Sequence, residues 1–153
     1  MVRLSDLTAG SRAAVTSVAA EPLDPPAWVA PRPAQQRTVA LVSSAGLGLR
    51  GQAPFRGGDN GYRTISHDAD AENIVMSHVS VNYDRTGFQL DLETVLPRRR
   101  LDELVAAGEV GAAAADHYSF MGATDPKAME AQARKLARTM LARGVDTAVL
   151  LPV

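Results

Sequence analysis

Arginine, aspartate and glycine residues gather between Gly46 and Asp70, in a stretch with the composition of a binding loop. Arg56 and Arg63 can each offer a planar pair of N–H donors to a carboxylate, and Asp59 between them can hold an amine. The same residues fit a second interpretation, in which Asp59 pairs with an arginine and only pins the loop. Both interpretations stay open, and Arg56, Asp59 and Arg63 are the candidate substrate-binding residues.

Three histidines, His67, His78 and His117, are the other groups that could bind a metal or transfer a proton. None of them forms the i, i+4 pair that places two ligands on one face of a helix, and there is no H-E-x-x-H pattern. With Asp68 and Asp70 they could still assemble a metal site in space. A metal hydrolase is therefore a third-ranked hypothesis, and no metal ligand is assigned.

His78 lies in an apolar run, residues 73–81, that is typical of a strand, and Asp84 follows shortly after it. A histidine in such a place acts either as a general acid or base or as a hydrogen-bonded structural residue. Together with His117 and Ser119, His78 and Asp84 are the candidate catalytic residues.

The segment from Gly46 to Gly51, GLGLRG, matches the G-x-G-x-x-G pattern of dinucleotide-binding loops. That pattern works only where a helix begins directly afterwards, because amides at the helix N-terminus hold the pyrophosphate. Pro54 and the Gly57–Gly58 pair oppose a helix there. We therefore predict a long active-site loop without regular structure, ending near Asp70, and no nucleotide.

Strands and helices alternate in the rest of the chain. Residues 38–46 and 144–153 are apolar in almost every position, as strands covered on both faces are. Residues 98–108 and 126–143 have helical patterns, with a short strand between them, and Thr124 or Asp125 can cap the second helix. The alternation predicts an α/β fold of Rossmann or flavodoxin-like type, a parallel sheet flanked by helices that binds ligands at the carboxyl ends of its strands.

Two further features concern the organisation of the chain. Residues 1–36 combine a weak helix with a proline-rich extended segment, in which Trp28 is expected to act as an anchor, and residues 37–153 form the α/β domain. Arg98, Arg99 and Arg100 begin a helix, where positive charge opposes the helix dipole, so we expect them on a solvated face.

Composition limits the classes of function. The chain has 153 residues, 22% of them charged, with a formal net charge of -1, which argues against nucleic acid or a membrane surface as partner. Its N-terminus lacks the apolar core of a signal peptide, so we expect a cytoplasmic protein. It has no cysteine, and so no disulfide, thiolate nucleophile or cysteine-bound metal.

Five segments occur in a distinctive order: SSAGLGLRGQAPFRGGDNGYRTIS, SHVSVNYDRTGFQLDLETVLP, LDELVAAGEVG, HYSFMG and ARGVDTAVLLPV. In this order they resemble the selenoprotein B family of glycine, sarcosine, betaine and D-proline reductases. The resemblance covers nearly everything from Thr38 to Val153 and implies an oxidoreductase. The first forty residues contribute little to it.

The resemblance implies a catalytic residue beyond this chain. In the family, the strand that matches VDTAVLLPV is followed at once by selenocysteine, or by cysteine in some members, with a further cysteine close by. UGA encodes selenocysteine and is also a stop codon. We therefore expect an N-terminal part of a reductase, with an α/β domain that is incomplete at its C-terminus. Without the nucleophile, this chain alone is expected to be inactive.

The family's chemistry implies the remaining partners. The selenol attacks the carbon next to an activated amine and cleaves the C–N bond of a small amino acid or amine. In the amino-acid reductases a partner subunit supplies a pyruvoyl group that binds the amine, and no cofactor is expected in this chain itself. Because a missing segment would leave apolar surface uncovered, we also expect a homo-oligomer. The alternative is a non-catalytic subunit of the same fold that binds a small anion or serves as a partner.

Overall fold

The computed structural model of the protein describes residues 3–17, 29–81 and 83–153, which belong to two compact units, Met1–Pro31 and Arg32–Val153. In the first unit a 3₁₀ turn, η1 (Leu4–Asp6), precedes α1 (Ala9–Ser17). Arg12 donates three hydrogen bonds to backbone carbonyls of residues 4–7 and so ties the turn to the helix. Trp28, expected to be an anchor, lies outside the described residues.

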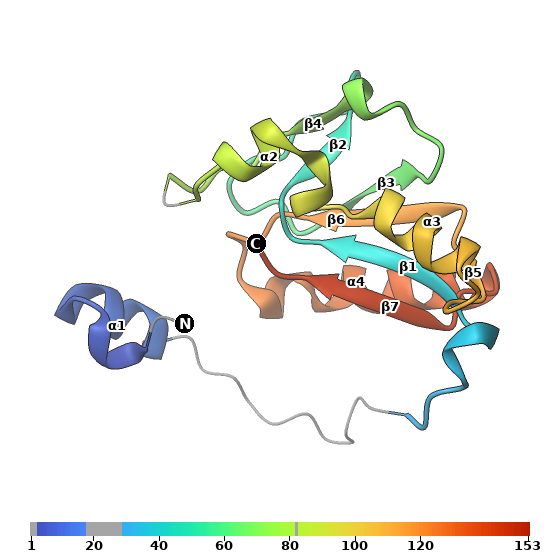
Figure 1. The fold of residues 1–153 in the computed structure, drawn as a ribbon. Helices are drawn as coiled ribbons and strands as arrows, with labels where there is room; N and C mark the ends of the chain where they lie inside the picture. The colour runs from blue at the N-terminus through green and yellow to red at the C-terminus, as the bar shows by residue number, and fades with distance from the viewer. Residues whose placement is uncertain (1–2, 18–28, 82) are drawn as a thin grey trace. The chain divides into compact units, whose positions relative to one another are not determined.

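The second unit is built on a curled, mostly parallel sheet (Figure 1). β7 pairs with Val39–Ser43 of the central strand β1 on one side, while β5 and then β6 pair with β1 on the other. Only β3, beyond β6, runs antiparallel to its neighbour. The sheet strands are β1 (Thr38–Ser43), β3 (Tyr62–Ser66), β5 (Ala112–Ala113), β6 (Asp116–Phe120) and β7 (Thr147–Leu151).

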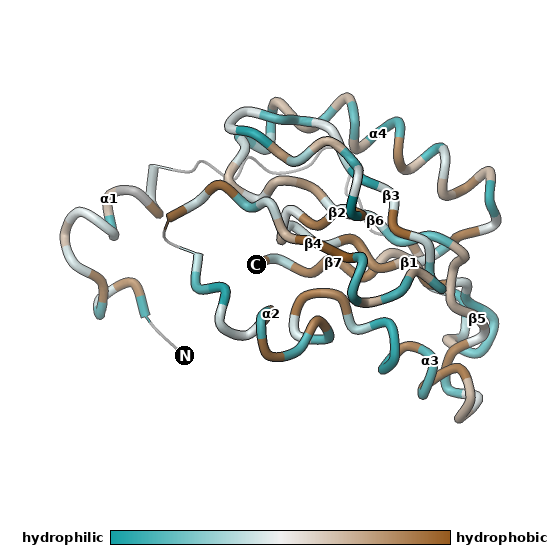
Figure 2. The backbone as a smooth tube through the Cα atoms, turned by 90° about the horizontal axis from the view of Figure 1, so that it is seen from above, coloured by the Kyte–Doolittle hydropathy of each residue, from teal (hydrophilic) through white to brown (hydrophobic). Residues whose placement is uncertain are grey.

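Helices cover both faces of this sheet, as predicted. α3 (Arg98–Ala106) packs Leu101 on one face, in a core that includes Val39 and Leu41, and α4 (Pro126–Ala142) packs Leu136 on the other. Figure 2 shows the two helices on opposite sides of the strands. Successive residues of β1 point to opposite faces, so its near-continuous apolar sequence serves both cores. None of the helices in the described ranges has the length and apolarity that crossing a bilayer requires.

The glycine-rich stretch contains two strands, so the prediction of a long loop without regular structure was wrong. β3 lies within it, and so does β2 (Leu47–Leu49), which pairs antiparallel with β4 (Ile74–Met76). The predicted strand over residues 73–81 therefore shrinks to its first third, and His78 lies in the loop after it. That loop leads through residue 85 to α2 (Thr86–Leu90) and the 3₁₀ turn η4 (Leu92–Thr94).

The N-terminal end of α4 agrees with the prediction from the sequence, whereas that of α3 does not. Of the two predicted caps, Thr124 and Asp125, it is Asp125 that caps α4, by accepting the Lys127 N–H at 3.0 Å. Arg98, by contrast, is only 9% exposed, and the prediction of a solvated face was wrong for this residue. Its guanidinium donates to the carbonyls of Ser66, His67 and Ala69, at the end of β3 and in the turn that follows it.

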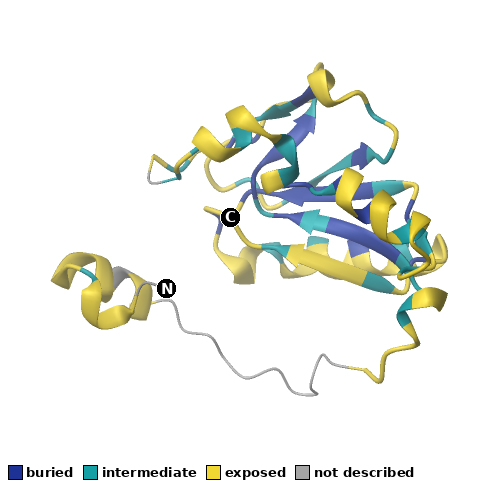
Figure 3. Ribbon diagram, viewed as in Figure 1, coloured by how far each residue is buried: buried dark blue, intermediate teal, exposed yellow. Residues whose placement is uncertain are grey.

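β7 is an exposed edge strand, although its apolar sequence predicted coverage on both faces (Figure 3). Leu150 is 71% exposed and Val149 is 40% exposed. The apolar pattern was interpreted correctly as a strand, but β1 covers only one edge of β7, and neither core extends fully over its side chains.

Candidate functional site

The carboxyl ends of β1, β6 and β7 meet at one edge of the sheet, where α/β proteins bind ligands. Ser43, the last residue of β1, pairs with Ser119 on β6 and with Leu151 on β7. The next residue, Ser44, accepts the Val153 N–H on its Oγ at 2.9 Å. Its own N–H donates to the Leu151 carbonyl at 3.0 Å. Ser44 thus fixes the chain beyond the end of β7 against the central strand.

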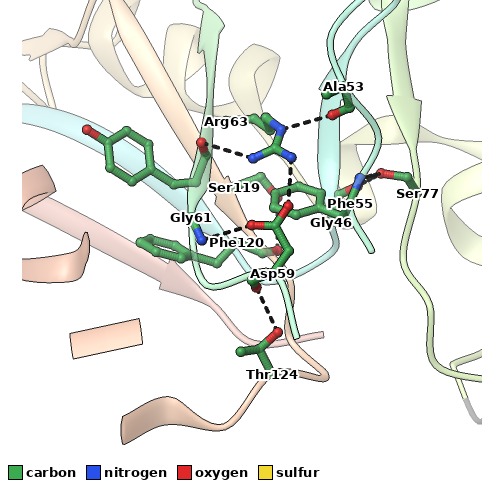
Figure 4. Close-up of polar contacts among 11 residues, drawn as sticks. Gly46, Ala53, Phe55, Asp59, Gly61, Arg63, Ser77, Ser119, Phe120 and Thr124 are labelled. Atoms are coloured by element: carbon green, nitrogen blue, oxygen red, sulfur yellow. Dashed lines mark hydrogen bonds and ion pairs between the residues drawn. The ribbon is translucent and has the colours of Figure 1, made fainter. Parts of the chain in front are cut away.

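Asp59 and Arg63 form an ion pair at this end of the molecule, 2.8 Å between Oδ2 and Nη2 (Figure 4). Arg63 also donates from Nε to the Ala53 carbonyl and stacks over the Phe55 ring. Burial works to raise the pKa of Asp59, but hydrogen bonds from Arg63 and from the Gly61 N–H outweigh it and lower that pKa. The structure thus favours the interpretation in which this pair pins the loop.

Arg56, the third candidate in the loop, lies on the surface. Its backbone carbonyl accepts the Asp59 N–H at 3.1 Å, which closes the turn between them. Thr124, just before α4, donates from Oγ1 to the Asp59 carbonyl at 2.8 Å and connects the loop to the carboxyl edge. Of the two predicted arginines, Arg56 is therefore the one with a guanidinium exposed for a carboxylate.

His78 lies next to the end of β1, because its backbone packs against Gly46, where a Cβ atom would come within 3.1 Å. The side chain is 7% exposed and packs on the Tyr83 ring, with centroids 4.8 Å apart. Nδ1 accepts the Ser80 N–H at 3.2 Å, so the ring proton sits on Nε2. That Nε2 is buried and has no partner among the described residues.

Two charges bear on the use of His78 in proton transfer. Burial, followed by the nearby positive charge of Arg85, lowers the pKa of His78, which favours the neutral ring. Arg85 itself donates from Nη2 to the His78 carbonyl at 2.7 Å. Asp84 does not join the histidine: it is exposed and its carboxylate accepts the Thr86 N–H at 2.9 Å. Hydrogen bonding from the Thr86 side chain, and then from its N–H, lowers the pKa of Asp84. The structure therefore does not bring this predicted pair together.

His117 lies at the opposite, amino end of β6 and is fully buried. Its Nδ1 accepts the Leu41 N–H at 3.1 Å, and its Nε2 lies 2.8 Å from Nδ1 of His67. His67 Nε2 in turn lies 2.9 Å from a carboxylate oxygen of Asp102 on α3. Because the Leu41 amide can only donate, each imidazole carries its proton on Nε2, directed outward along the chain.

His117, with His67 bonded to it, supplies a hydrogen-bond acceptor where β1 has no backbone acceptor from a neighbouring strand. β1 pairs with β5 through Thr38 and Val39 and with β6 through Val42 and Ser43, and between these ladders the imidazole of His117 replaces a backbone acceptor. Burial, and then the nearby His67 and Arg98, lowers the pKa of His117 to about 4, so the ring is neutral at pH 7. These contacts are those of a structural histidine. His117 lies at the amino end of β6, whereas His78 lies near the carboxyl ends of the strands.

Ser119 is also buried, with its Oγ accepting the Leu47 N–H at 2.9 Å and donating to the Phe120 carbonyl at 3.4 Å. It attaches the β2–β4 pair to the main sheet rather than facing a cavity. Sequence reasoning missed the role of Asp102 altogether and considered His67 only as a metal ligand. No local pattern could have found them, since His67 lies 50 positions from His117 and 35 from Asp102.

Two concave surfaces flank the sheet. A polar cavity of about 460 Å³ lies beside His67 and Arg98, at the amino end of β6, with acidic residues of α3 and η4 in its wall. A larger apolar groove of about 640 Å³ lies between α4 and β7 and reaches Ser43 and Ser44 at the carboxyl edge. Within the residues that the structure describes, no three His, Asp or Glu side chains are grouped closely enough to hold a metal ion.

Comparison of the whole chain with protein-family models, with curated proteins and with solved structures found no match.

Proposed function

We propose that the chain is the N-terminal portion of a selenoprotein B-type reductase, with a Rossmann or flavodoxin-like domain whose selenol or thiol follows Val153. The five sequence segments and the order in which they occur support this proposal. One geometric observation gives it its strongest support. Ser44 holds the Val153 backbone at the carboxyl edge of the central strand, so the next residue would stand where α/β proteins place their reactive groups.

The reaction replaces a C–N bond by a C–H and an N–H bond and needs two electrons. The selenolate attacks the carbon beside the amine and forms a Se–C bond as the C–N bond breaks. A dithiol then releases the product by attack on selenium and becomes a disulfide, while protons complete the new C–H and N–H bonds. A pyruvoyl group on a partner subunit would bind the amine and make the nitrogen a better leaving group.

This chain would bind and orient the substrate. Arg56 has an exposed guanidinium for the carboxylate of a small amino acid. The neutral His78 has an Nε2–H that lacks a partner among the described residues and lies near Gly46, at the end of β1. Asp59 and Arg63 would keep the loop of Arg56 in place through their ion pair.

The alternative, a non-catalytic subunit that binds a small anion through the same loop, has weaker support. An anion site of two arginines needs both guanidinium groups, and Arg63 directs its own into Asp59, Ala53 and Phe55. Arg56 alone would have to supply the positive charge, without the hold on the amine that a pyruvoyl group would add in the reductase, and a single exposed arginine binds a small anion weakly.

The gene and a longer form of the protein test the proposal. We expect UGA after the codon for Val153, then a frame that continues with a cysteine within a few codons. The longer protein, with cysteine in place of selenocysteine, should cleave glycine, sarcosine, betaine or D-proline with a dithiol, measured as amine released in the presence of the partner subunit. A UAA or UAG codon, or a longer protein inactive on all four compounds, would contradict the proposal.

A further inference from the structure

The free edge of β7 is ready to pair with another strand. The Leu151 carbonyl accepts the Ser44 N–H, so the polar backbone groups of Thr147, Val149 and Leu151 point toward β1. Those of Ala148 and Leu150 alternate with them and point away from the sheet. Charge, proline or a covering element normally protects such an edge, and β7 has no charged residue between Thr147 and Leu151.

The apolar groove is lined by the side chains of the same residues of β7. Ala148 and Leu150 form one wall, and an apolar stripe on α4 forms the other. Leu136 is the only residue of this helix that is buried, Met129 and Met140 are half-buried, and Ala133 is exposed. The apolar stripe of α4 is therefore covered only in part, being buried at Leu136 and exposed toward the open groove at Ala133.

Handedness determines which face a further element would cover. The step from β6 to β7 passes over β1 with α4 on its face, and the step from β1 to β6 runs in the reverse direction with α3 on the other face. Connections between parallel strands are right-handed almost without exception. A strand added beside β7 continues in the direction of β6 to β7, so its connecting helix must lie on the face of α4, over the groove.

The two edges of the sheet differ, because the edge strand β3 is protected by polar contacts and β7 is not. β3 carries polar residues at three of its five positions besides Tyr62, and Gln52 donates to the Thr64 carbonyl on that side. Its residues are half-buried or buried throughout. One edge is thus closed by polar contacts of the chain itself, while the other has apolar side chains beside an apolar groove.

We propose that the edge of β7 pairs with a parallel strand and that the groove takes the helix connecting β7 to it, both supplied by the segment that follows Val153. This assignment rests on the proposed function, which places such a segment there. The helix contributes apolar side chains to the space between Ala133, Met140 and Leu150. The new strand accepts and donates hydrogen bonds at Ala148 and Leu150.

Amide hydrogen exchange of the 153-residue chain and of the longer protein tests the pairing directly. The Leu150 N–H should exchange rapidly in the shorter chain and at least about 100-fold more slowly in the longer one. The Val149 N–H, which points toward β1, is the matched internal control and should be protected in both. Equal, rapid exchange of Leu150 in both proteins would overturn the proposal.

A pair of substitutions on α4 tests the helix in the groove. Ala133→Arg points into the groove, and Ala137→Arg lies at an exposed position that does not line it. Both should leave the Tm of the shorter chain unchanged. In the longer protein only Ala133→Arg should lower the Tm, by roughly 5 °C or more. Equal effects of the two substitutions in the longer protein would contradict burial of the groove.

The remaining outcomes separate this inference from the proposed function. Protection of Leu150 in the shorter chain that rises with protein concentration would mean that a second copy covers the edge, and would overturn the assignment. So would a gene without a helix and strand after Val153. Protection of Leu150 without reductase activity would leave the surface assigned and remove the proposed function. Reductase activity of the longer protein without protection of Leu150 would support the proposed function and overturn the assignment of this surface.

Discussion

The buried His117 should make the stability of the protein depend on pH. Its pKa is lowered from 6.5 to about 4 in the folded chain, chiefly by burial. Between these values the unfolded state binds more protons than the folded state, so the free energy of unfolding falls as the pH falls from about 6.5 to about 4. The contribution is fully present above pH 6.5 and is lost by pH 4.

The size of the effect follows from the shift. A difference of about 2.5 pKa units corresponds to about 3 kcal/mol for the whole range, at 1.36 kcal/mol per unit. Between pH 7.5 and pH 5.0 the loss from His117 alone should be about 2 kcal/mol. His78, whose pKa is also lowered, changes the stability in the same direction and must be separated from it.

His117→Asn provides that separation, because an amide oxygen can accept the Leu41 N–H in place of Nδ1 but does not titrate in this range. Urea denaturation at pH 7.5 and pH 5.0 gives the loss of unfolding free energy on acidification for each protein, and the difference between the two losses is the contribution of His117. We expect the variant to be less stable at pH 7.5 and to lose about 2 kcal/mol less on acidification. An equal loss in both proteins would refute the assignment of a neutral, buried His117.

Three further predictions concern the loop and the chemistry. Asp59→Asn should lower the free energy of unfolding by about 1–2 kcal/mol in urea denaturation, because it removes a largely buried charged hydrogen bond, whereas Glu130→Gln in the exposed pair with Arg134 should change it by less than about 0.5 kcal/mol. Similar losses would argue against the pinned loop. The 153-residue chain should release no amine from glycine, sarcosine, betaine or D-proline with any dithiol, and activity would show that the nucleophile is assigned to the wrong place. Calorimetric titration with Zn²⁺ should show no tight stoichiometric binding, and a tight site would revive the metal hydrolase.

The strongly apolar elements could be predicted from the sequence. β1 is a continuous apolar run, and α4 has apolar residues at helical spacing. Asp125 and Pro126 mark the start of α4. β2 and β3 were missed because glycine and polar residues interrupt their apolar patterns, and because β2 pairs with β4 outside the main sheet. The exposure of β7 could not be read from its residue types, since β7 has none of the charges that usually mark an edge strand and its sequence is that of a strand in the middle of a sheet.

The candidate site was predicted less well than the fold, for a related reason. Its residues were chosen by type, and type does not say which partner each will meet. Arg63 and Arg56 look equivalent in the sequence, yet one is held by Asp59 and the other is exposed. His78 and His117 also look alike, but they lie at opposite ends of the strands, because His78 follows β4 and His117 lies near the start of β6.

The contact between Leu41 and His117 gives the sheet a built-in indicator of its own protonation. An amide that donates to a backbone carbonyl is indifferent to mild acid, but this one donates to a group that can itself take up a proton. Once Nδ1 is protonated, the Leu41 N–H faces another donor and the contact becomes repulsive. The nuclear magnetic resonance shift of this single amide should therefore move with pH in step with the histidine, while its neighbours along β1 stay constant until the sheet unfolds.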